Sequence, residues 1–409
     1  MISKWWTGIL VAVLISGILL IQCEEKKIMN EKSFKEDAAF LKQYTQLITL
    51  HNKDGKAKVA VCPELQGRVM TSTATGDNGL SFGWINYSFF EEGIQNEHMN
   101  AYGGEDRLWL GPEGGQFSIF FKPGVSMTFE NWFTPPPINS ESWTLENETQ
   151  TSVEMQKKMH LTNYSGTEFD LNIIRTVLLL TKTSVDQILD IEVSKEIDFV
   201  GYETKNVLTN TGDKAWDKET GTLSIWMLDM LKTGKEVTVV IPHKEGKEED
   251  LGPVATTNYF GEIPPDRIIM KGGVIYFKAD GNQRGKLGLS WKGAKKYAGS
   301  YDADKKLLTL ISFSISPQEK LYVNSLWEHQ KNPFKGDVIN SYNDGPLEDG
   351  SQMGPFYEIE SSSPAAFLEP DESITHYHRV FHFIGEEDEL DKISIETLGV
   401  GLRQITSVF

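Results

Sequence analysis

The chain has 409 residues, a formal net charge of −18 at pH 7 and 11% aromatic residues. This length allows two or three ordinary domains or one large all-β unit. The negative charge argues against nucleic acid as a partner, because such binding needs a basic face that displaces counterions. It is compatible with a soluble body that handles neutral or cationic ligands.

An apolar segment opens the chain. Lys4 precedes an uncharged run over residues 5–22, which is the pattern of a secretory signal peptide, although its length also approaches that of a membrane span. Cys23 ends the run in LIQC, which resembles the lipobox of bacterial lipoproteins, whose cysteine is acylated. We therefore expect a lipoprotein signal peptide at 1–22, lipidation at Cys23 and a charged tether at 23–32. This favours a lipid anchor in the bacterial cell envelope over an uncleaved membrane anchor.

Cys62 is the second of the two cysteines. If Cys23 is acylated, no disulfide can form within the chain. Cys62 stands in the apolar run KVAVCPE, so we expect a small buried residue on a strand.

A helix is expected directly after the tether. In SFKEDAAFLKQYTQLITL, apolar residues recur at helical spacing from Phe34 to Leu47, and Ser33 is suited to cap the first turn. Residues 52–55 would close this segment. A second helix is expected near the C-terminus, in LDKISIETLGVGL.

Between these two segments the sequence indicates β-structure almost without interruption. Short apolar or alternating runs are separated by turn-forming pairs that contain Asn, Asp and Gly. The runs are KVAVCP, RVMTST, FSIFF, VEMQKKMHL, LNIIRTVLLL, LSIWMLDM, VTVVI, VIYFKA, LGLSW, LLTLISFSI and LYVNSLW. They predict one continuous antiparallel β-sandwich domain over residues 33–409, preceded by a short helix.

The stretch GGEDRLWLGPEGGQFS, residues 103–118, combines five glycines with acidic residues, an arginine and an indole. A phosphate-binding loop is excluded, because no Gly-Lys pair is followed by Ser or Thr. Arg107 and Trp109 would share one face of an extended strand, where an indole can stack on a sugar ring while charged groups bind its hydroxyls. We therefore take Arg107, Trp109 and Gln116 as candidate sugar-binding residues and Glu113 as a candidate catalytic carboxyl. The alternative is a tight turn with solvated acids and a core tryptophan.

A second acidic cluster lies more than 200 positions later, in YNDGPLEDGSQMGPFYEIESS. Asn343 and Asp344 begin a turn, and both are candidate sugar ligands. Glu358 and Glu360 alternate along FYEIESS, so both carboxyls should lie on one strand face and raise each other's pKa if enclosed. Such a pair suits proton transfer near neutral pH. The alternative is an exposed strand face in an acidic protein.

Three of the eight histidines gather in THYHRVFHF. His376, His378 and His382 should lie on one face of a strand. Spacing of the His-x-His type also occurs in metal sites, but the Glu that a cupin would add on the same strand is lacking. We rank structural histidines first, acid–base or sugar-binding histidines second and a metal site last.

Taken together, these stretches resemble an uncharacterised family of bacterial lipoproteins whose fold is similar to that of galactose mutarotase, a large β-supersandwich. The resemblance runs from Phe34 to the C-terminus and is carried by PELQGRVMTST, GGEDRLWLGPEGGQFS, LTNTGDKAW, KADGNQRGKLGLS and the segment from SYNDGP to HYHRVFHF. Mutarotases carry a His-x-Tyr-Phe-Asn segment that supplies a catalytic histidine. This chain has TNYF at residues 257–260, so the resemblance implies an acid from His376 or His378 and a base from Glu358 or Glu360.

We therefore expect a lipid-anchored envelope protein that binds carbohydrate and handles it by carboxylate and histidine acid–base chemistry. In a mutarotation, Glu358 would take the proton of the anomeric hydroxyl and His378 would protonate the ring oxygen, while Arg107, Trp109 and Asn343 hold the sugar. His376 and Glu360 would add sugar contacts. A glycoside hydrolase or lyase, a non-catalytic glycan-binding protein and a scaffold with a degenerate cleft remain alternatives. No cofactor or metal is expected.

Overall fold

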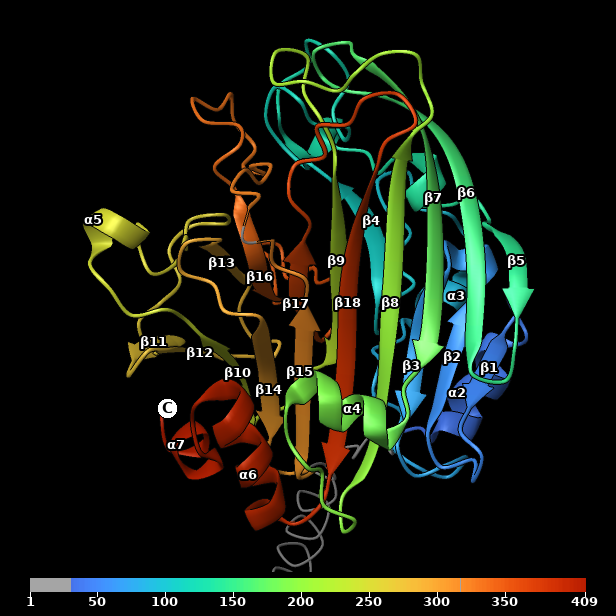
Figure 1. Ribbon diagram of the computed structural model, residues 1–409, viewed down its shortest axis with the longest axis vertical. Coiled ribbons are helices and arrows are strands. Elements are labelled where there is room, and N and C mark those ends of the chain that lie inside the picture. Colours follow the sequence, from blue (N-terminus) through green and yellow to red (C-terminus); the bar gives the residue numbers. More distant parts are fainter. Residues whose placement is uncertain (1–30, 317) are drawn as a thin grey trace, which may run out of the picture. The chain divides into compact units, whose positions relative to one another are not determined.

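The computed structural model describes residues 31–316 and 318–409, and Ser33–Phe409 forms one compact unit (Figure 1). Antiparallel strands dominate this unit, which confirms the all-β prediction with a short N-terminal helix. The predicted signal peptide at 1–22, Cys23 and most of the predicted tether lie outside the described residues. Every helix in the described part of the chain is too short or too polar to span a bilayer.

The largest layer is a ten-stranded sheet with the spatial order β11-β12-β10-β14-β15-β18-β8-β7-β6-β5 (Figure 1). Its strands are β5 Thr144–Glu148, β6 Ser152–Thr162, β7 Glu168–Leu179, β8 Asp198–Asn210, β10 Val237–Pro242, β11 Ile268–Lys271, β12 Val274–Lys278, β14 Tyr297–Asp302, β15 Leu307–Phe313 and β18 Ser373–Ile384. β18 pairs with β8 along its whole length. The C-terminal histidine strand therefore lies in the middle of this sheet.

A five-stranded sheet packs against it, with the order β13-β16-β17-β9-β4. Its strands are β4 Arg107–Gly111, β9 Ser224–Lys232, β13 Gly285–Ser290, β16 Asp337–Asn343 and β17 Phe356–Ser362. Side chains such as Leu108, Met227, Leu287 and Ile359 point into the core between the two sheets. Because successive strand residues point to opposite faces, their neighbours in sequence lie on the outer face of the small sheet.

A three-stranded sheet completes the strands, with β1 Ile48–His51, β2 Lys58–Cys62 and β3 Arg68–Thr73. Cys62 is a free, fully buried residue on β2, as predicted. The N-terminal helix α2 spans Phe34–Leu41, and Ser33 caps it as predicted: the Ser33 hydroxyl accepts from the Glu36 backbone N–H at 3.4 Å. The prediction that the helical pattern continues to Leu47 is wrong, because Ile48 and Leu50 bury their side chains by pairing with β2.

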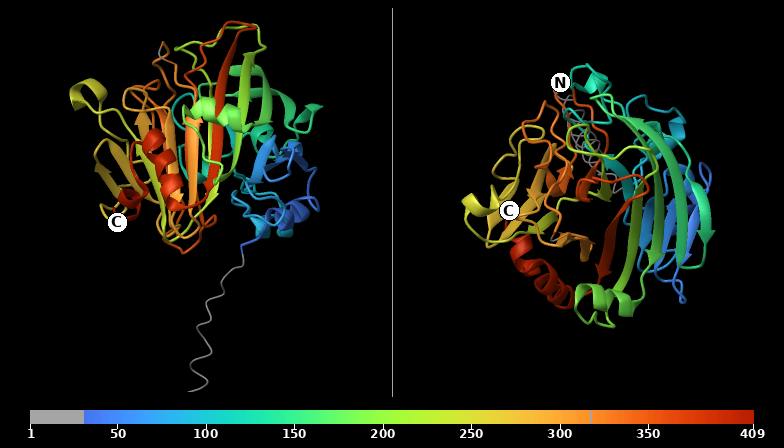
Figure 2. Two further views of the ribbon diagram at one scale, coloured as in Figure 1. Left: turned by 60° about the horizontal axis from the view of Figure 1, so that its bottom comes forward. Right: turned by 45° about the horizontal axis from the view of Figure 1, so that its top comes forward.

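The remaining helices are α3 Tyr87–Glu92, α4 Lys182–Leu189, α5 Glu248–Leu251, α6 Glu387–Leu398 and α7 Leu402–Thr406, with 3-10 turns η1 Pro63–Leu65, η2 Phe129–Asn131 and η3 Pro136–Ile138. The predicted C-terminal helix is confirmed as α6 and α7. In the left view of Figure 2, red α6 lies over strands of the large sheet. Its residues Leu390 and Leu398 join an apolar cluster with Tyr297 and Leu308 of that sheet.

Two predicted strands are wrong. Residues 117–121 (FSIFF) and 321–327 (LYVNSLW) are buried or partly buried loops. In the first, Ser118 folds the chain back by donating its backbone N–H to Gly115 at 3.1 Å, and all four apolar side chains enter the core. A short apolar run therefore indicates burial but does not by itself distinguish a strand from a packed loop.

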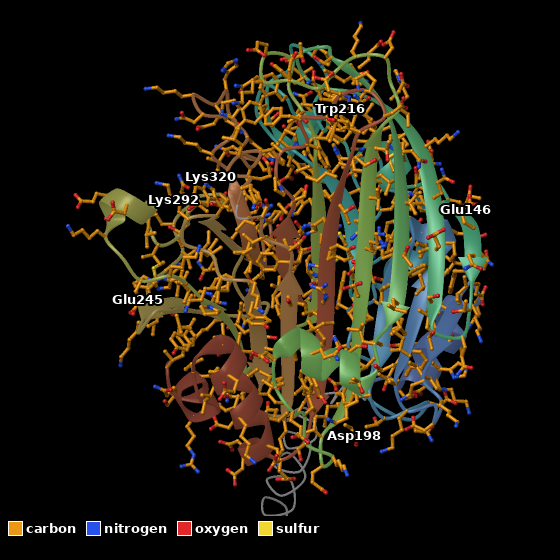
Figure 3. All side chains as sticks on the ribbon, in the orientation of Figure 1. Glu146, Asp198, Trp216, Glu245, Lys292 and Lys320 are labelled. Carbon is orange, nitrogen blue, oxygen red and sulfur yellow. The ribbon has the colours of Figure 1, made fainter. Side chains whose placement is uncertain are left out.

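Exposed carboxylates such as Glu146 and Glu245 point outward from the unit (Figure 3).

Candidate functional site

A pocket lies on the outer face of the five-stranded sheet. Its floor comes from alternate residues of all five strands: Arg107 and Trp109 of β4, Trp226 and Leu228 of β9, Lys286 of β13, Tyr342 of β16, and Phe356 and Glu358 of β17. Loops supply its walls: Met99, Glu113, Phe129, Trp132, Phe260, Arg284, Trp327 and Met353. The cavity volume is about 110 Å³, several times the space that one water molecule needs.

The strand register brings the charged residues of the floor together. Lys286 lies opposite Tyr342, and Tyr342 lies opposite Glu358, so that these three side chains form one row across β13, β16 and β17. Arg107 lies opposite Leu228, and Leu228 lies opposite Glu360, which form a second row. The predicted placement of Arg107 with Trp109, and of Glu358 with Glu360, on the same strand faces is therefore confirmed.

Two ion pairs lie in the floor. Arg107 Nη2 is 2.8 Å from Glu358 Oε1, and Lys286 Nζ is 2.9 Å from Glu360 Oε2. The Trp226 indole N–H also donates to Glu360 Oε2, at 2.9 Å. All four charged side chains are at most 9% exposed. Buried charges are costly unless they are paired, and this pairing explains how the fold accommodates four of them in one floor.

The carboxyls of the pocket have perturbed acidities. Burial raises the pKa of Glu358 to about 7, with Glu360 adding to the shift and Arg107 opposing it. Burial also raises the pKa of Glu113, although Lys286 lowers it. Burial alone would lower the pKa of Lys286, but the surrounding carboxylates raise it. The pocket therefore contains a cationic lysine and two carboxyls whose pKa values are shifted towards neutrality, as general acids and bases require.

Four tryptophans line the pocket. The ring centroids of Trp109 and Trp226 are 5.6 Å apart, and those of Trp132 and Trp327 are 6.0 Å apart. The Arg107 guanidinium lies 4.3 Å from the centroid of Trp109. Flat aromatic walls next to charged donors and acceptors suit a ligand with both apolar and polar faces.

The mouth of the pocket is bordered by Phe129, Phe260 and Met353, which we call the apolar rim. These side chains are 59%, 38% and 43% exposed. Phe260 is held in place by its neighbour Tyr259, whose hydroxyl donates to Asp337 Oδ2 at 2.7 Å. Exposed apolar side chains gathered at a cavity mouth favour a binding role.

Five predicted sugar ligands lie outside the lining. Two of them are fully buried, Glu360 against Lys286 and His376 against Ser361. The other three are Gln116, Asn343 and Asp344. Gln116 is bonded to the backbone of Gln330, with Nε2 donating to its carbonyl and Oε1 accepting from its N–H, both at 3.0 Å. Asn343 bonds to the backbone of the loop that precedes β13. Asp344 accepts from the Tyr342 hydroxyl at 2.6 Å. Asp344 therefore orients a residue of the pocket floor, and the other two stabilise loops.

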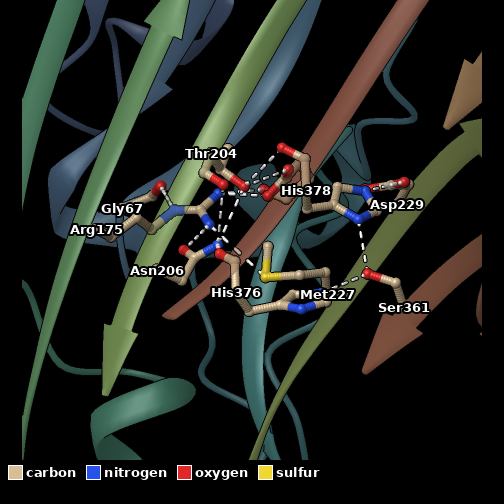
Figure 4. A network of polar contacts seen from close by, with 10 residues as sticks. Gly67, Arg175, Thr204, Asn206, Met227, Asp229, Ser361, His376 and His378 are labelled. Atoms are coloured by element: carbon tan, nitrogen blue, oxygen red, sulfur yellow. Dashed lines mark hydrogen bonds and ion pairs between the residues drawn. The ribbon is translucent and has the colours of Figure 1, made fainter. Parts of the chain in front are cut away.

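The histidines lie between the two sheets (Figure 4). His378 Nε2 is 2.8 Å from Asp229 Oδ2, and the Ser361 hydroxyl bonds to both His376 Nε2 and His378 Nδ1 at 2.8 Å. Burial lowers the pKa of His376 to about 3. Burial would also lower the pKa of His378, but the charge and hydrogen bond of Asp229, together with the charge of Asp106, raise it overall. Both rings are fully enclosed members of one hydrogen-bonded network.

The expected convergence of the three candidate catalytic residues is only partly met. Glu113 and Glu358 line one pocket, whereas His378 lies on the opposite face of the small sheet. The physical reason is strand alternation: Ser361 of β17 points towards the histidines, so Glu358 and Glu360 point away from them. The expectation that the histidines share one strand face is confirmed, since His382 also points inward, with Nε2 3.0 Å from Glu105 Oε1.

The same interior layer contains a possible ligand set for a metal ion. Atoms of Asp106, Asp229 and His378 lie within 4.8 Å of one another, and all three residues are buried. Arg175, however, forms an ion pair with Asp106 and is itself fully buried. Because this guanidinium already supplies positive charge next to the buried carboxylates, the close approach of Asp106, Asp229 and His378 is explained without a metal ion.

Several pocket residues were not anticipated from the sequence. Trp226 and Lys286 stand in or beside runs that were recognised as strands, and Tyr342 directly precedes the predicted turn at Asn343. Arg284 and Trp327 stand in loops. The available signal was a polar or bulky residue at alternate positions of an apolar strand. Alternation gives the face that a residue shares with its neighbours, but not which face of the sheet carries the pocket.

The fold is a β-supersandwich similar to that of galactose mutarotase-like proteins. The sequence of residues 32–409 matches a family described as "Family of unknown function (DUF6786)", and the chain belongs to this family. No curated protein matches the sequence.

Three solved structures have a similar fold. Slr1438 from Synechocystis sp. PCC 6803 is 12% identical and covers 84% of this chain and 96% of its own, with a TM-score of 0.50. A "putative aldose 1-epimerase" from Escherichia coli K12 is 12% identical, with 83% and 99% coverage and a TM-score of 0.50. A galactose mutarotase-like protein from Lactobacillus casei ATCC 334 is 10% identical, with 82% and 100% coverage and a TM-score of 0.47. The TM-scores of 0.50 for the first two structures show a likeness of fold, and at 12% identity the likeness extends to the fold alone.

Proposed function

We propose that the pocket binds a saccharide ring and exchanges protons with it through Glu358 and Glu113. The observation that carries this proposal is that two carboxyls with raised pKa values line one tryptophan-walled pocket. The name of the Escherichia coli protein, which refers to aldose epimerisation, supports the same class of ligand. Perturbed carboxyls in a cleft are a recognised sign of a reactive site.

The lining matches the two-sided chemistry of a sugar. The indoles of Trp109 and Trp226 present apolar surface to the C–H groups of a ring, while Arg107 and Lys286 provide donors for hydroxyl or ring oxygens. Glu358 retains its acceptor capacity beyond the single oxygen that Arg107 engages. A ring could therefore stack and be hydrogen-bonded in one pose.

The reaction that fits best is interconversion of anomers. The Glu358 carboxylate takes the proton of the anomeric hydroxyl, and the C1–O5 bond breaks as Glu113 gives its proton to O5. The open-chain aldehyde rotates about C1–C2 and closes in reverse: O5 attacks C1 and returns its proton to Glu113, while the C1 oxygen regains a proton from Glu358. Both carboxyls end in their starting states. In this proposal Glu113 takes the role of the acid that the sequence suggested for His378.

A second candidate is a glycan-binding site without turnover. The observation in its favour is that the Glu358 carboxylate is already engaged by Arg107 at 2.8 Å, as a purely structural charge would be. Both candidates require a saccharide in the pocket. They differ in whether the bound anomer changes.

The test is magnetisation exchange between α and β anomers by NMR, together with titration calorimetry, on a panel of neutral aldoses. Glu358→Gln and Glu113→Gln should each reduce exchange by about 100-fold or more, the size of a general acid or base contribution, with little change in melting temperature. The exposed Glu146→Gln is the matched control and should leave exchange unchanged. Binding without exchange would establish the second candidate. Exchange that survives in both pocket variants would refute the assignment.

The lipid anchor and envelope location remain proposals that rest on the sequence around Cys23. We expect a fatty-acylated N-terminal cysteine in protein purified from membranes. Mass spectrometry of the mature N-terminus would detect it, and Cys23→Ala should release the protein from the membrane fraction. Unchanged membrane association of that variant would point to an uncleaved apolar segment.

A further inference from the structure

Arg284 differs from the other two cations of the pocket. Arg107 and Lys286 each have a carboxylate within 3 Å. Among residues 31–316 and 318–409, no carboxylate lies within ion-pair distance of Arg284. Its Nε donates to the neutral Tyr342 hydroxyl at 3.2 Å. Arg284 is therefore the pocket cation without an ion pair of its own in the described part of the chain, and at longer range its charge opposes the raised pKa values of Glu113 and Asp344.

Its position is nevertheless well defined. The guanidinium lies 3.8 Å from the centroid of Phe260, on the apolar rim, and 6.0 Å from that of Tyr342. Stacking on an aromatic face holds the planar group in one orientation and leaves its outer N–H donors free. Phe260 is itself fixed through Tyr259 and Asp337. An exposed arginine held by two rings at a cavity mouth is prepared for a ligand.

The chemistry of this group specifies the ligand. Two parallel N–H donors of a guanidinium match the paired oxygens of a carboxylate or a sulfate ester, and such charge-assisted bonds are stronger than those to neutral hydroxyls. The whole chain carries a net charge of −18, which disfavours anions in general. A fixed cation at the mouth would offset this repulsion locally and so favour a ligand that places an anionic group next to Arg284.

We propose that the pocket takes an anionic saccharide, one that carries a carboxylate or sulfate group bound by Arg284 while the ring occupies the tryptophan-lined floor. This assignment rests on the proposed saccharide function of the pocket and narrows it to a substrate class. Carboxylate and sulfate share the recognition chemistry, and the experiment separates them.

The experiment is titration calorimetry of the purified protein with matched sets: D-galactose, D-galacturonate and D-galactose 6-sulfate, and the corresponding D-glucose series. We expect one anionic member of a set to bind about tenfold or more tightly than its neutral counterpart, as charge-assisted hydrogen bonds imply. Arg284→Met, which keeps an apolar stem over Phe260, should abolish that preference, so that the neutral and anionic members of a set bind with equal affinity. Lys292→Met is the control, because it removes the same charge from another exposed position.

The outcomes are distinct. Equal affinity for neutral and anionic members, or a preference that survives in Arg284→Met, would overturn the anion assignment and leave a saccharide site. Binding of inorganic sulfate as tight as that of the sulfated sugar would show an anion site without ring recognition and would also overturn it. Absence of binding by every member of both sets would overturn the saccharide function together with this narrower assignment.

Discussion

Replacing Arg175 with methionine tests the polar layer between the two sheets. Arg175 of β7 has no exposed surface and donates Nε to the Gly67 carbonyl at 2.9 Å and Nη1 to Asn206 Oδ1 at 2.7 Å. Its Nη2 forms an ion pair with Asp106. Asp106 directly precedes β4, whose first residue is Arg107 of the pocket, so this contact ties the five-stranded sheet to the large sheet.

The expected cost follows from what methionine leaves behind. Methionine fills much of the arginine stem volume but donates no hydrogen bond, so the Asp106 carboxylate stays buried without its cation. Breaking a buried pair from one side costs about 3–5 kcal/mol. The lost partners of Gly67 and Asn206 act at the same place and overlap with that figure, since contacts in one network are not additive. We expect a loss of about 3–5 kcal/mol, a large share of the roughly 5–15 kcal/mol that stabilises a domain.

Urea unfolding measures this change as a lower midpoint at unchanged slope. Lys56→Met is the matched control, because the Lys56–Asp198 pair is 61% and 42% exposed and its loss should leave the unfolding midpoint almost unchanged. Adding Asp106→Asn to the Arg175 variant should recover part of the loss, since it removes the stranded charge. If Arg175→Met and Lys56→Met lower the free energy of unfolding by the same amount, the buried Arg175–Asp106 pair does not stabilise the fold.

Three further predictions concern the pocket. Turnover should rise with pH as Glu358 ionises near pH 7. Lys286→Met should shift this rise to higher pH, because it removes a positive charge that lowers the pKa of Glu358. An unshifted pH–rate profile would contradict the assignment of Glu358 as the base. Tyr259→Phe removes the bond to Asp337 and should weaken saccharide binding roughly fivefold by loosening the apolar rim, measured by calorimetry. Trp109→Ala should lower the free energy of unfolding by about 3–5 kcal/mol and also weaken saccharide binding, because the indole is only 4% exposed and lines the pocket. Unchanged saccharide affinity would show that Trp109 is a core residue only.

The sequence was sufficient for the architecture because β-structure has a local signature. Alternating apolar residues and regularly spaced turns predicted a single large sandwich, and most of the expected runs are strands. The failures lie where tertiary contacts decide the local conformation. Residues 117–121 are apolar because they fill the core as a loop. The helix expected up to Leu47 ends at Leu41, because the chain then turns into β1, where Ile48 pairs with β2.

The candidate site was predictable in part for the same reason. Alternation along each strand correctly grouped Arg107 with Trp109 and Glu358 with Glu360. It could not indicate that Glu358 and His378 face opposite sides of one sheet, because that depends on which sheet each strand joins. Residues such as Arg284 gave no local signal, since an arginine in a polar loop is common and only the stacking on Phe260 distinguishes it.

The separation of these two faces gives a decisive test of the histidine hypothesis. If His378 is structural, His378→Asn should remove the donor to Asp229, destabilise the fold by about 1–3 kcal/mol and leave the pH–rate profile of the pocket unchanged. The reason for the unchanged profile is that Glu358 and Glu113 keep their own surroundings on the other side of β17. If instead anomer exchange falls 100-fold at an unchanged melting temperature, the imidazole takes part in the chemistry. Glu113 would then lose the role of acid, and the interior layer, not the tryptophan-lined pocket, would contain the reacting groups.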